Sequence, residues 1–267
     1  ELLGEICVKR FVKLVAVALA ALLVAASLSA CGGNPDAGSL APESNGSTET
    51  VELDLVKEGT LVMGTNAEFP PFEYKEGTGF AGIDVDLMRA IAEKMGLELE
   101  VEDMAFESLI AAGFTIDPTR EATCDFSDTY FNATQTVILK ADSTIATLED
   151  LKGKKIGVQT GTTGKDKAAE VTDAANITQY NNGSLAVEAL VSGQIDAVII
   201  DQSPAMAYKD QHGDSLKLLE NLFDEEEYAL AVKKGNKELL EAINQALKEL
   251  KENGTFDQIV EKYIPSK

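Results

Sequence analysis

The sequence predicts an α/β protein with two lobes, and three observations support this. After residue 50, apolar runs typical of strands alternate with segments of helical periodicity, the pattern of largely parallel sheets covered on both faces. This part of the chain has about 215 residues, which is long for one such sheet and natural for two. Two extended stretches, 134–140 and 228–232, are placed where a chain could cross between lobes.

The expected elements follow one another from residue 61. Strands are predicted at 61–65, 97–101, 155–158 and 196–200, and helices at 83–95, 106–112, 164–171, 185–192 and 237–251, with a short last helix through Tyr263. The first helix shows the reasoning: Ile83, Leu87 and Ile91 share one face, and Gly96 marks the end. No repeat of 20 to 50 residues interrupts this order.

The first fifty residues have the composition of a targeting segment and a linker. Lys9, Arg10 and Lys13 precede an apolar run, 14–28, that is shorter than the roughly twenty residues a membrane span needs. The sequence 28–32 resembles the lipobox of bacterial lipoproteins, so residues 1–30 are expected to be a signal peptide and Cys31 the lipid attachment. Residues 31–50 are polar and small, typical of a flexible tether. We therefore expect an extracytoplasmic protein anchored by lipid alone.

Composition excludes several classes of function. The 23 Lys+Arg against 45 Asp+Glu give a net charge of −22, which disfavours nucleic acid as a partner. One histidine and three cysteines leave little for a zinc site or a Ser-His-Asp triad, and no metal or cofactor is expected. Cys7 and Cys31 belong to the targeting segment, so Cys124 is alone and is interpreted as a small buried hydrophobic residue.

Three polar groups are expected at carboxyl ends of strands, where open α/β sheets bind ligands. The Gly/Thr loop 157–164 precedes a helix and forms either an anion site or a tight turn. Thr115 and Arg120 lie close in sequence; the arginine either clamps a carboxylate or pairs with a neighbouring acid at the surface. Asp201 follows an apolar strand and either caps the next helix or accepts a cation. Together they fit a zwitterionic amino acid.

The chain from about Val51 to Ile264 resembles the polar amino acid substrate-binding proteins of bacterial ABC transporters, which have the type II periplasmic-binding fold. The resembling segments are 64–73, 82–87, 125–128, 159–163, 195–201 and 253–256, with Lys262 and Tyr263. The resemblance implies that residues 51–134 and 228–267 form lobe 1 and residues 138–222 form lobe 2. The crossovers 134–140 and 222–232 would be the hinge.

The resemblance also implies a function and its residues. A monomer would capture a free amino acid, close over it and dock on a permease; the alternative is an arogenate or prephenate dehydratase-like enzyme with Glu68 as its acid. The residues implied for the α-carboxylate are Arg120, Thr115, the Gly113 backbone, Thr162 and Thr163, and Asp201 is implied for the α-ammonium. Phe69 and Phe106 would contact the aliphatic part of the ligand, or belong to the plain core. Asn66 and Asp84 would lie toward the side-chain end, although Asp84 could instead be a helix cap. A basic or uncharged polar ligand is expected, because an acidic one would need a second arginine.

One departure from the family concerns lobe 1. Relatives continue the helix at 106–112 and then form a buried strand before the residues that match Gly113 and Thr115. Here roughly ten residues are missing, and Ala112 runs directly into Gly113. Either 111–116 is drawn into the vacant strand position or the lobe keeps a gap, and both outcomes would weaken carboxylate binding.

Overall fold

The computed structural model describes residues 53–106, 114–219 and 222–265. The predicted signal peptide, the predicted lipid attachment at Cys31, the predicted tether and the predicted helix beyond Phe106 lie outside the described residues, as does Gly113. The chain divides into two compact units, 1–49 and 50–267, and the second contains the whole fold. Within the described ranges, no helix has the length and apolar character that a membrane span requires.

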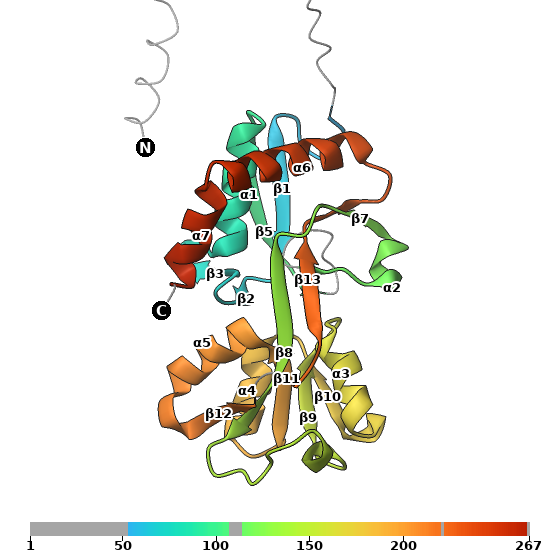
Figure 1. The fold of residues 1–267 in the computed structure, drawn as a ribbon, viewed down its shortest axis with the longest axis vertical. Helices are drawn as coiled ribbons and strands as arrows, with labels where there is room; N and C mark the ends of the chain where they lie inside the picture. The colour runs from blue at the N-terminus through green and yellow to red at the C-terminus, as the bar shows by residue number, and fades with distance from the viewer. Residues whose placement is uncertain (1–52, 107–113, 220–221, 266–267) are drawn as a thin grey trace, which may run out of the picture. The chain divides into compact units, whose positions relative to one another are not determined.

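Lobe 1 is built around two parallel strands, β1 (Thr60–Thr65) and β5 (Glu98–Asp103). They are joined by a small antiparallel sheet, β2 (Glu68–Phe69), β3 (Glu73–Glu76) and β4 (Gly79–Ala81), and by helix α1 (Ile83–Lys94). The C-terminal helices α6 (Lys237–Glu252) and α7 (Thr255–Tyr263) pack against α1, as Figure 1 shows. The N-terminal and C-terminal parts of the fold therefore share one lobe.

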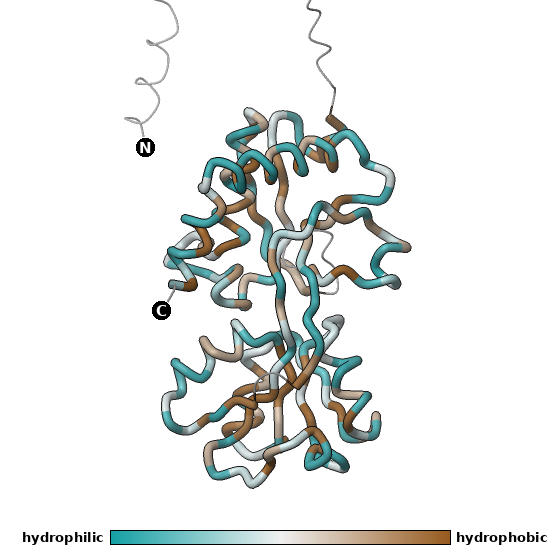
Figure 2. Tube along the Cα trace, in the orientation of Figure 1, coloured by the Kyte–Doolittle hydropathy of each residue, from teal (hydrophilic) through white to brown (hydrophobic). Residues whose placement is uncertain are grey.

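Lobe 2 contains the larger sheet. Strand β9 (Ile156–Gln159) pairs in parallel with β10 (Ile177–Tyr180) and with β11 (Ala197–Asp201), and β11 pairs antiparallel with the crossover strand β8 (Phe131–Lys140). Strand β12 (Leu216–Leu219) also joins β8. Helices α3 (Gly164–Val171), α4 (Gly183–Val191) and α5 (Gln202–His212) surround these strands, with one-turn helices at Glu149–Leu151, Ala174–Asn176 and Gly213–Ser215. The central strands are among the most hydrophobic parts of the chain (Figure 2).

Two extended strands connect the lobes. Strand β8 pairs antiparallel with β13 (Glu225–Ala229), and both run between the lobes in Figure 1. On the lobe 1 side, β13 also pairs with β6 (Phe114–Thr115), which leads into the short helix α2 (Pro118–Glu121). Strands β7 (Cys124–Phe126) and β14 (Ala231–Lys233) form the last pair. Through β6, the segment that leads into α2 is therefore attached to the crossover strand β13.

The predicted α/β class, with two lobes and two crossover strands, is confirmed. The predicted helices 83–95, 164–171, 185–192 and 237–251 correspond to α1, α3, α4 and α6, with ends within two residues. Their apolar faces lie in the core: Ile83, Leu87 and Ile91 are fully buried, and Gly96 has a positive φ just after α1. The small sheet β2–β4, β7, β10 and β12 were not predicted, because short strands in polar sequence carry weak periodicity.

A cavity lies beside β1 in lobe 1. Among the described residues β1 pairs only with β5, and β6 joins β13 instead of β1. The cavity has a volume of about 530 Å³, and its walls include Leu61 and Val62 of β1, Val232 of β14, and Ile243 of α6. Residues 111–113, on which the choice between the two expected outcomes depends, lie outside the described residues, so both outcomes stay predictions.

Candidate functional site

Arg120 lies where the two lobes meet. Asp117 caps α2 by accepting from the Thr119 backbone N–H at 2.7 Å, and the helix directs Arg120 toward lobe 2. The guanidinium donates to the carbonyl oxygen of Thr115 at 2.7 Å and to that of Gly161, in the Gly/Thr loop of lobe 2, at 3.0 Å. Its carbon is 4.1 Å from the centre of the Phe114 ring. Arg120 forms no ion pair with an acid of the described residues, and Asp125, one of its neighbours, pairs with Lys234 instead.

Burial lowers the pKa of Arg120 from its ordinary value, chiefly because it removes water from the guanidinium. The carboxylates of Asp117, Asp201 and Glu226 oppose this shift. An arginine retains its charge in proteins, so the site holds a positive charge that is partly withdrawn from solvent. Such a cation is suited to binding a carboxylate.

Asp201 ends β11 and is 6% exposed. Its side chain makes no capping hydrogen bond to α5, so the capping alternative does not apply. Instead the hydroxyl of Tyr228, from β13, donates to the Asp201 carboxylate. Burial raises the pKa of Asp201 from 3.8 to about 6, and the Tyr228 hydrogen bond limits that rise. The carboxylate is thus a desolvated acceptor, suited to a ligand cation.

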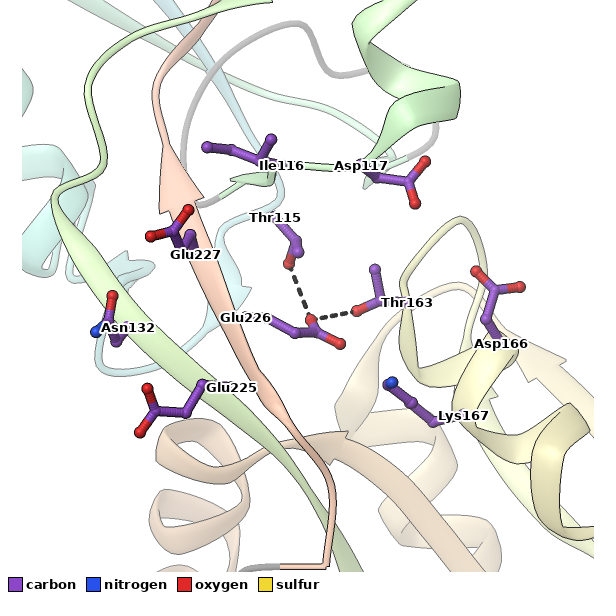
Figure 3. Close-up of a pocket in the computed structure, with 10 residues that line it drawn as sticks. All are labelled: Thr115, Ile116, Asp117, Asn132, Thr163, Asp166, Lys167, Glu225, Glu226 and Glu227. Carbon is purple, nitrogen blue, oxygen red and sulfur yellow. Dashed lines mark hydrogen bonds between the residues drawn. The ribbon is translucent and has the colours of Figure 1, made fainter.

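Glu226 occupies the space between two residues that were expected to bind the ligand. Its Oε2 accepts hydrogen bonds from Thr163 Oγ1 at 2.7 Å, Thr115 Oγ1 at 3.2 Å and Gln135 Nε2 at 3.4 Å. Figure 3 shows this carboxylate, on β13, between Thr115 of lobe 1 and Thr163 of lobe 2. The three residues line a cavity of about 540 Å³.

A second group of contacts joins the lobes around Asn66. Asn66 Oδ1 accepts from Gln159 Nε2 at 2.9 Å, and its Nδ2 donates to the carbonyl of Met104 at 3.3 Å. Nearby in sequence, the Glu68 carboxylate accepts from Ser184 Oγ at 3.1 Å. Asn66 is therefore placed between the lobes, whereas Thr162 donates within its own loop, to the carbonyl of Gln159 at 2.9 Å.

Three further predicted residues have other surroundings. Phe69 is 7% exposed and packs on Phe72, with ring centres 5.9 Å apart. Phe106 stacks on Phe114 at 5.2 Å, and the Arg120 guanidinium lies over its ring at 5.6 Å. No contact brings the two predicted aromatic walls together in the described residues.

Asp84 is not where we expected it. It was predicted near the cleft, but it is fully buried in lobe 1, where the Tyr130 hydroxyl lies 2.8 and 2.9 Å from its two oxygens. The cause is its position in the first turn of α1, which begins inside the core next to Phe72. The adjacent carboxyl of Glu73 has a pKa raised well above 4.5, first by burial and then by Asp84.

Three contributors to the site, Gln135, Glu226 and Tyr228, were not predicted from sequence. Gln135 is fully buried and Tyr228 is 1% exposed, and both come from the crossover strands. The available signal at Gln135 was weak, because that strand also contains Asn132, Thr134 and Thr136. Glu226 was hidden in the run Glu225–Glu227, which is typical of a solvated surface.

The fold and this arrangement are those of a two-lobed binding protein. Residues 61–266 match the family of bacterial extracellular solute-binding proteins, family 3, and the chain belongs to that family. Among curated relatives, it is 36% identical over 219 residues to the arginine-binding extracellular protein ArtP of Bacillus subtilis, covering 76% of this chain and 86% of ArtP. It is 30% identical to the glutamine-binding protein GlnH of the same organism, covering 94% of this chain and 97% of GlnH.

Solved structures are similar as well. An ancestral arginine-binding protein bound to glutamine is 42% identical, with a TM-score of 0.74, and the alignment covers 79% of this chain and all of that protein. The arginine-, lysine-, histidine-binding protein ArtJ of Geobacillus stearothermophilus is 31% identical, also with a TM-score of 0.74, covering 78% and 96% of the two chains. The predicted family is confirmed.

Proposed function

We propose that this protein captures a free amino acid outside the cytoplasm and delivers it to the permease of an ABC transporter. The observation that carries the proposal is the convergence of Arg120 and Asp201 from different lobes on one partly desolvated space. A half-buried cation and a buried carboxylate are suited to the two charges of a zwitterion. Relatives whose names state arginine or glutamine binding support the same class of ligand.

In this proposal every predicted residue except Asp84, which lies in the core of lobe 1, keeps its role. Arg120, Thr115 and Thr163 hold the α-carboxylate, with Thr162 and the Gly113 backbone beside them, and Asp201 holds the α-ammonium. Phe69 and Phe106 line the path of the side chain, and Asn66 stands at its end. Closure of the lobes around the β8 and β13 crossovers would bury the ligand, and the liganded form would dock as a monomer.

The ligand is proposed to be basic or uncharged and polar. Arg120, Asp201 and Glu226 together carry a formal charge of −1. A ligand with one net positive charge balances this sum, whereas glutamate or aspartate doubles the excess. Arg89, the second arginine of the folded domain, pairs with Asp86 on α1 and is not directed to the site.

We further propose that Cys31 carries the lipid that anchors the protein and that the protein is not an enzyme. The enzyme alternative places an acid at Glu68, whose carboxylate instead accepts a hydrogen bond from Ser184. When arogenate or prephenate is added to the protein, we expect no keto acid to be released. Mass spectrometry of membrane fractions from cells that express the protein should show a lipidated N-terminal peptide that is lost in Cys31→Ala.

The proposed function is tested by a thermal-shift screen against the twenty amino acids. A basic or uncharged polar amino acid should give the largest increase in melting temperature. Calorimetry on that ligand should then give a Kd in the micromolar range, roughly −8 kcal/mol of binding free energy. No shift with any amino acid would contradict the proposal.

A further inference from the structure

The carboxylate of Glu226 holds the two hydroxyl groups that the proposed function assigns to the ligand. Thr163 Oγ1 and Thr115 Oγ1 both donate to Glu226 Oε2, at 2.7 and 3.2 Å. A threonine hydroxyl has one hydrogen to donate. A ligand carboxylate therefore cannot receive either hydrogen while Glu226 keeps both.

The position of Glu226 is one that favours an anion. Thr163 immediately precedes α3, so the carboxylate lies at the positive end of that eight-residue helix. Gln135, fully buried on β8, adds a third donor to the same oxygen at 3.4 Å. Strand β13 fixes the position through backbone pairing with β8 and β6. The side chain is thus held in place by both lobes and by the crossover strands.

The charges around Arg120 also indicate different roles for Asp201 and Glu226. Asp201 and Glu226 both act on Arg120, the one cation among these groups. Among the hydrogen bonds of the described residues, Asp201 accepts from the Tyr228 hydroxyl and from neither threonine, which leaves it as the acceptor for a ligand ammonium. Glu226 instead stands beside the donors for the ligand carboxylate. An arriving carboxylate meets a negative charge already present.

We propose that Glu226 is an internal competitor for the α-carboxylate subsite, which lowers the affinity for amino acids and must be displaced when one binds. This inference rests on the proposed function and adds a specificity-determining residue to it. It predicts that Glu226 lowers the binding affinity only for ligands that carry a free carboxylate.

The test is a calorimetric comparison of the protein with Glu226→Gln, using L-arginine, L-glutamine and L-arginine methyl ester as probes. The glutamine variant keeps the size and an acceptor oxygen but removes the charge. Glu241→Gln, on the exposed side of α6, removes the same charge away from the site. Glu226→Ala also removes the hydrogen bonds, and it replaces Glu226→Gln if that variant folds poorly. The melting temperature of each of the three variants shows whether it is folded.

We expect at least a tenfold lower Kd in Glu226→Gln for whichever free amino acid binds the unaltered protein, less than a twofold change for the methyl ester, and no change in Glu241→Gln. An unchanged Kd would overturn the inference. A weaker affinity would also overturn it and would indicate that Glu226 binds the ligand cation. An equal gain for the ester would show a general charge effect instead of competition. If no amino acid bound to the unaltered protein or to any variant, the proposed function would be overturned as well. If an amino acid bound but Glu226→Gln did not strengthen its binding, only the inference about Glu226 would fail.

Discussion

Lowering the pH from 7 to 5 should weaken amino acid binding, because Asp201 must be ionised to hold the α-ammonium. Burial raises the pKa of this carboxyl from 3.8 to about 6. With that value, roughly ten in eleven molecules carry the charge at pH 7 and about one in eleven at pH 5. The expected loss of affinity is therefore about tenfold, and binding below pH 6 should release a proton.

The raised pKa of Asp201 has the opposite effect on folding stability, because acidification weakens binding but stabilises the fold. Because the folded-state pKa of Asp201 lies above the unfolded value, the ionised group destabilises the fold by about 3 kcal/mol above pH 6. That penalty disappears as the pH falls from 6 toward 3.8, since the folded protein then binds the proton more tightly. Asp201→Asn should consequently unfold at a higher denaturant concentration at pH 7, by up to this amount, while losing ligand binding.

The assay is calorimetry at pH 5, 6 and 7 in two buffers with different enthalpies of ionisation, which also counts the protons released. Tyr228→Phe is the matched variant: without its hydrogen bond the pKa of Asp201 should rise further and the loss of affinity should begin at higher pH. The single histidine, His212, is the last residue of α5, whereas Asp201 immediately precedes the first, so the histidine lies at the opposite end of that helix. An affinity that is flat between pH 5 and 7, or that rises on acidification, would refute this reasoning.

Three other predictions follow from the site and from lobe 1. Arg120→Ala should abolish detectable binding in calorimetry, a cost of several kcal/mol out of roughly eight, because a ligand carboxylate would be left without its cation in a closed cleft. Arg120→Lys should be nearly as damaging, because a lysine cannot donate to two carbonyls in a fixed fork as this guanidinium does. Insertion of a helical turn and an apolar strand of about ten residues after Ala112 should raise the melting temperature and strengthen binding, since each buried aliphatic side chain contributes on the order of 1.5 to 3 kcal/mol.

Each of these has a control and an outcome that contradicts it. Arg89→Ala removes an arginine on the α1 surface and should leave the affinity unchanged, and a loss of less than tenfold in Arg120→Ala would disprove the assignment. For Arg120→Lys, near-normal affinity would show that charge alone is sufficient. An inserted strand of the same length with polar residues should give no gain. No gain in melting temperature or in affinity from the apolar insertion would show that the cavity beside β1 is harmless.

Much of the fold followed from local pattern. The helical periodicity of 83–95 and 237–251 and the apolar run 196–200 are visible in the sequence because each element buries its own face. Arg120 and Asp201 were predicted for a similar reason, since a lone arginine and a carboxylate after an apolar strand are unusual where they stand. Residue types and local periodicity therefore determined the α/β class and marked Arg120 and Asp201 as candidate site residues, whose proposed ligand roles came from the family resemblance.

The tertiary structure decided what those anchors meet. Glu226 contacts Thr115 and Thr163, which lie 111 and 63 residues away in sequence, only because β13 pairs with both β6 and β8. Asp84, like Asp201, stands at the start of a helix, yet it lies in the core of lobe 1. The pKa of Asp201 likewise depends on burial by elements distant in sequence. Desolvation and long-range strand pairing are properties of the assembled chain, so no local pattern could determine them.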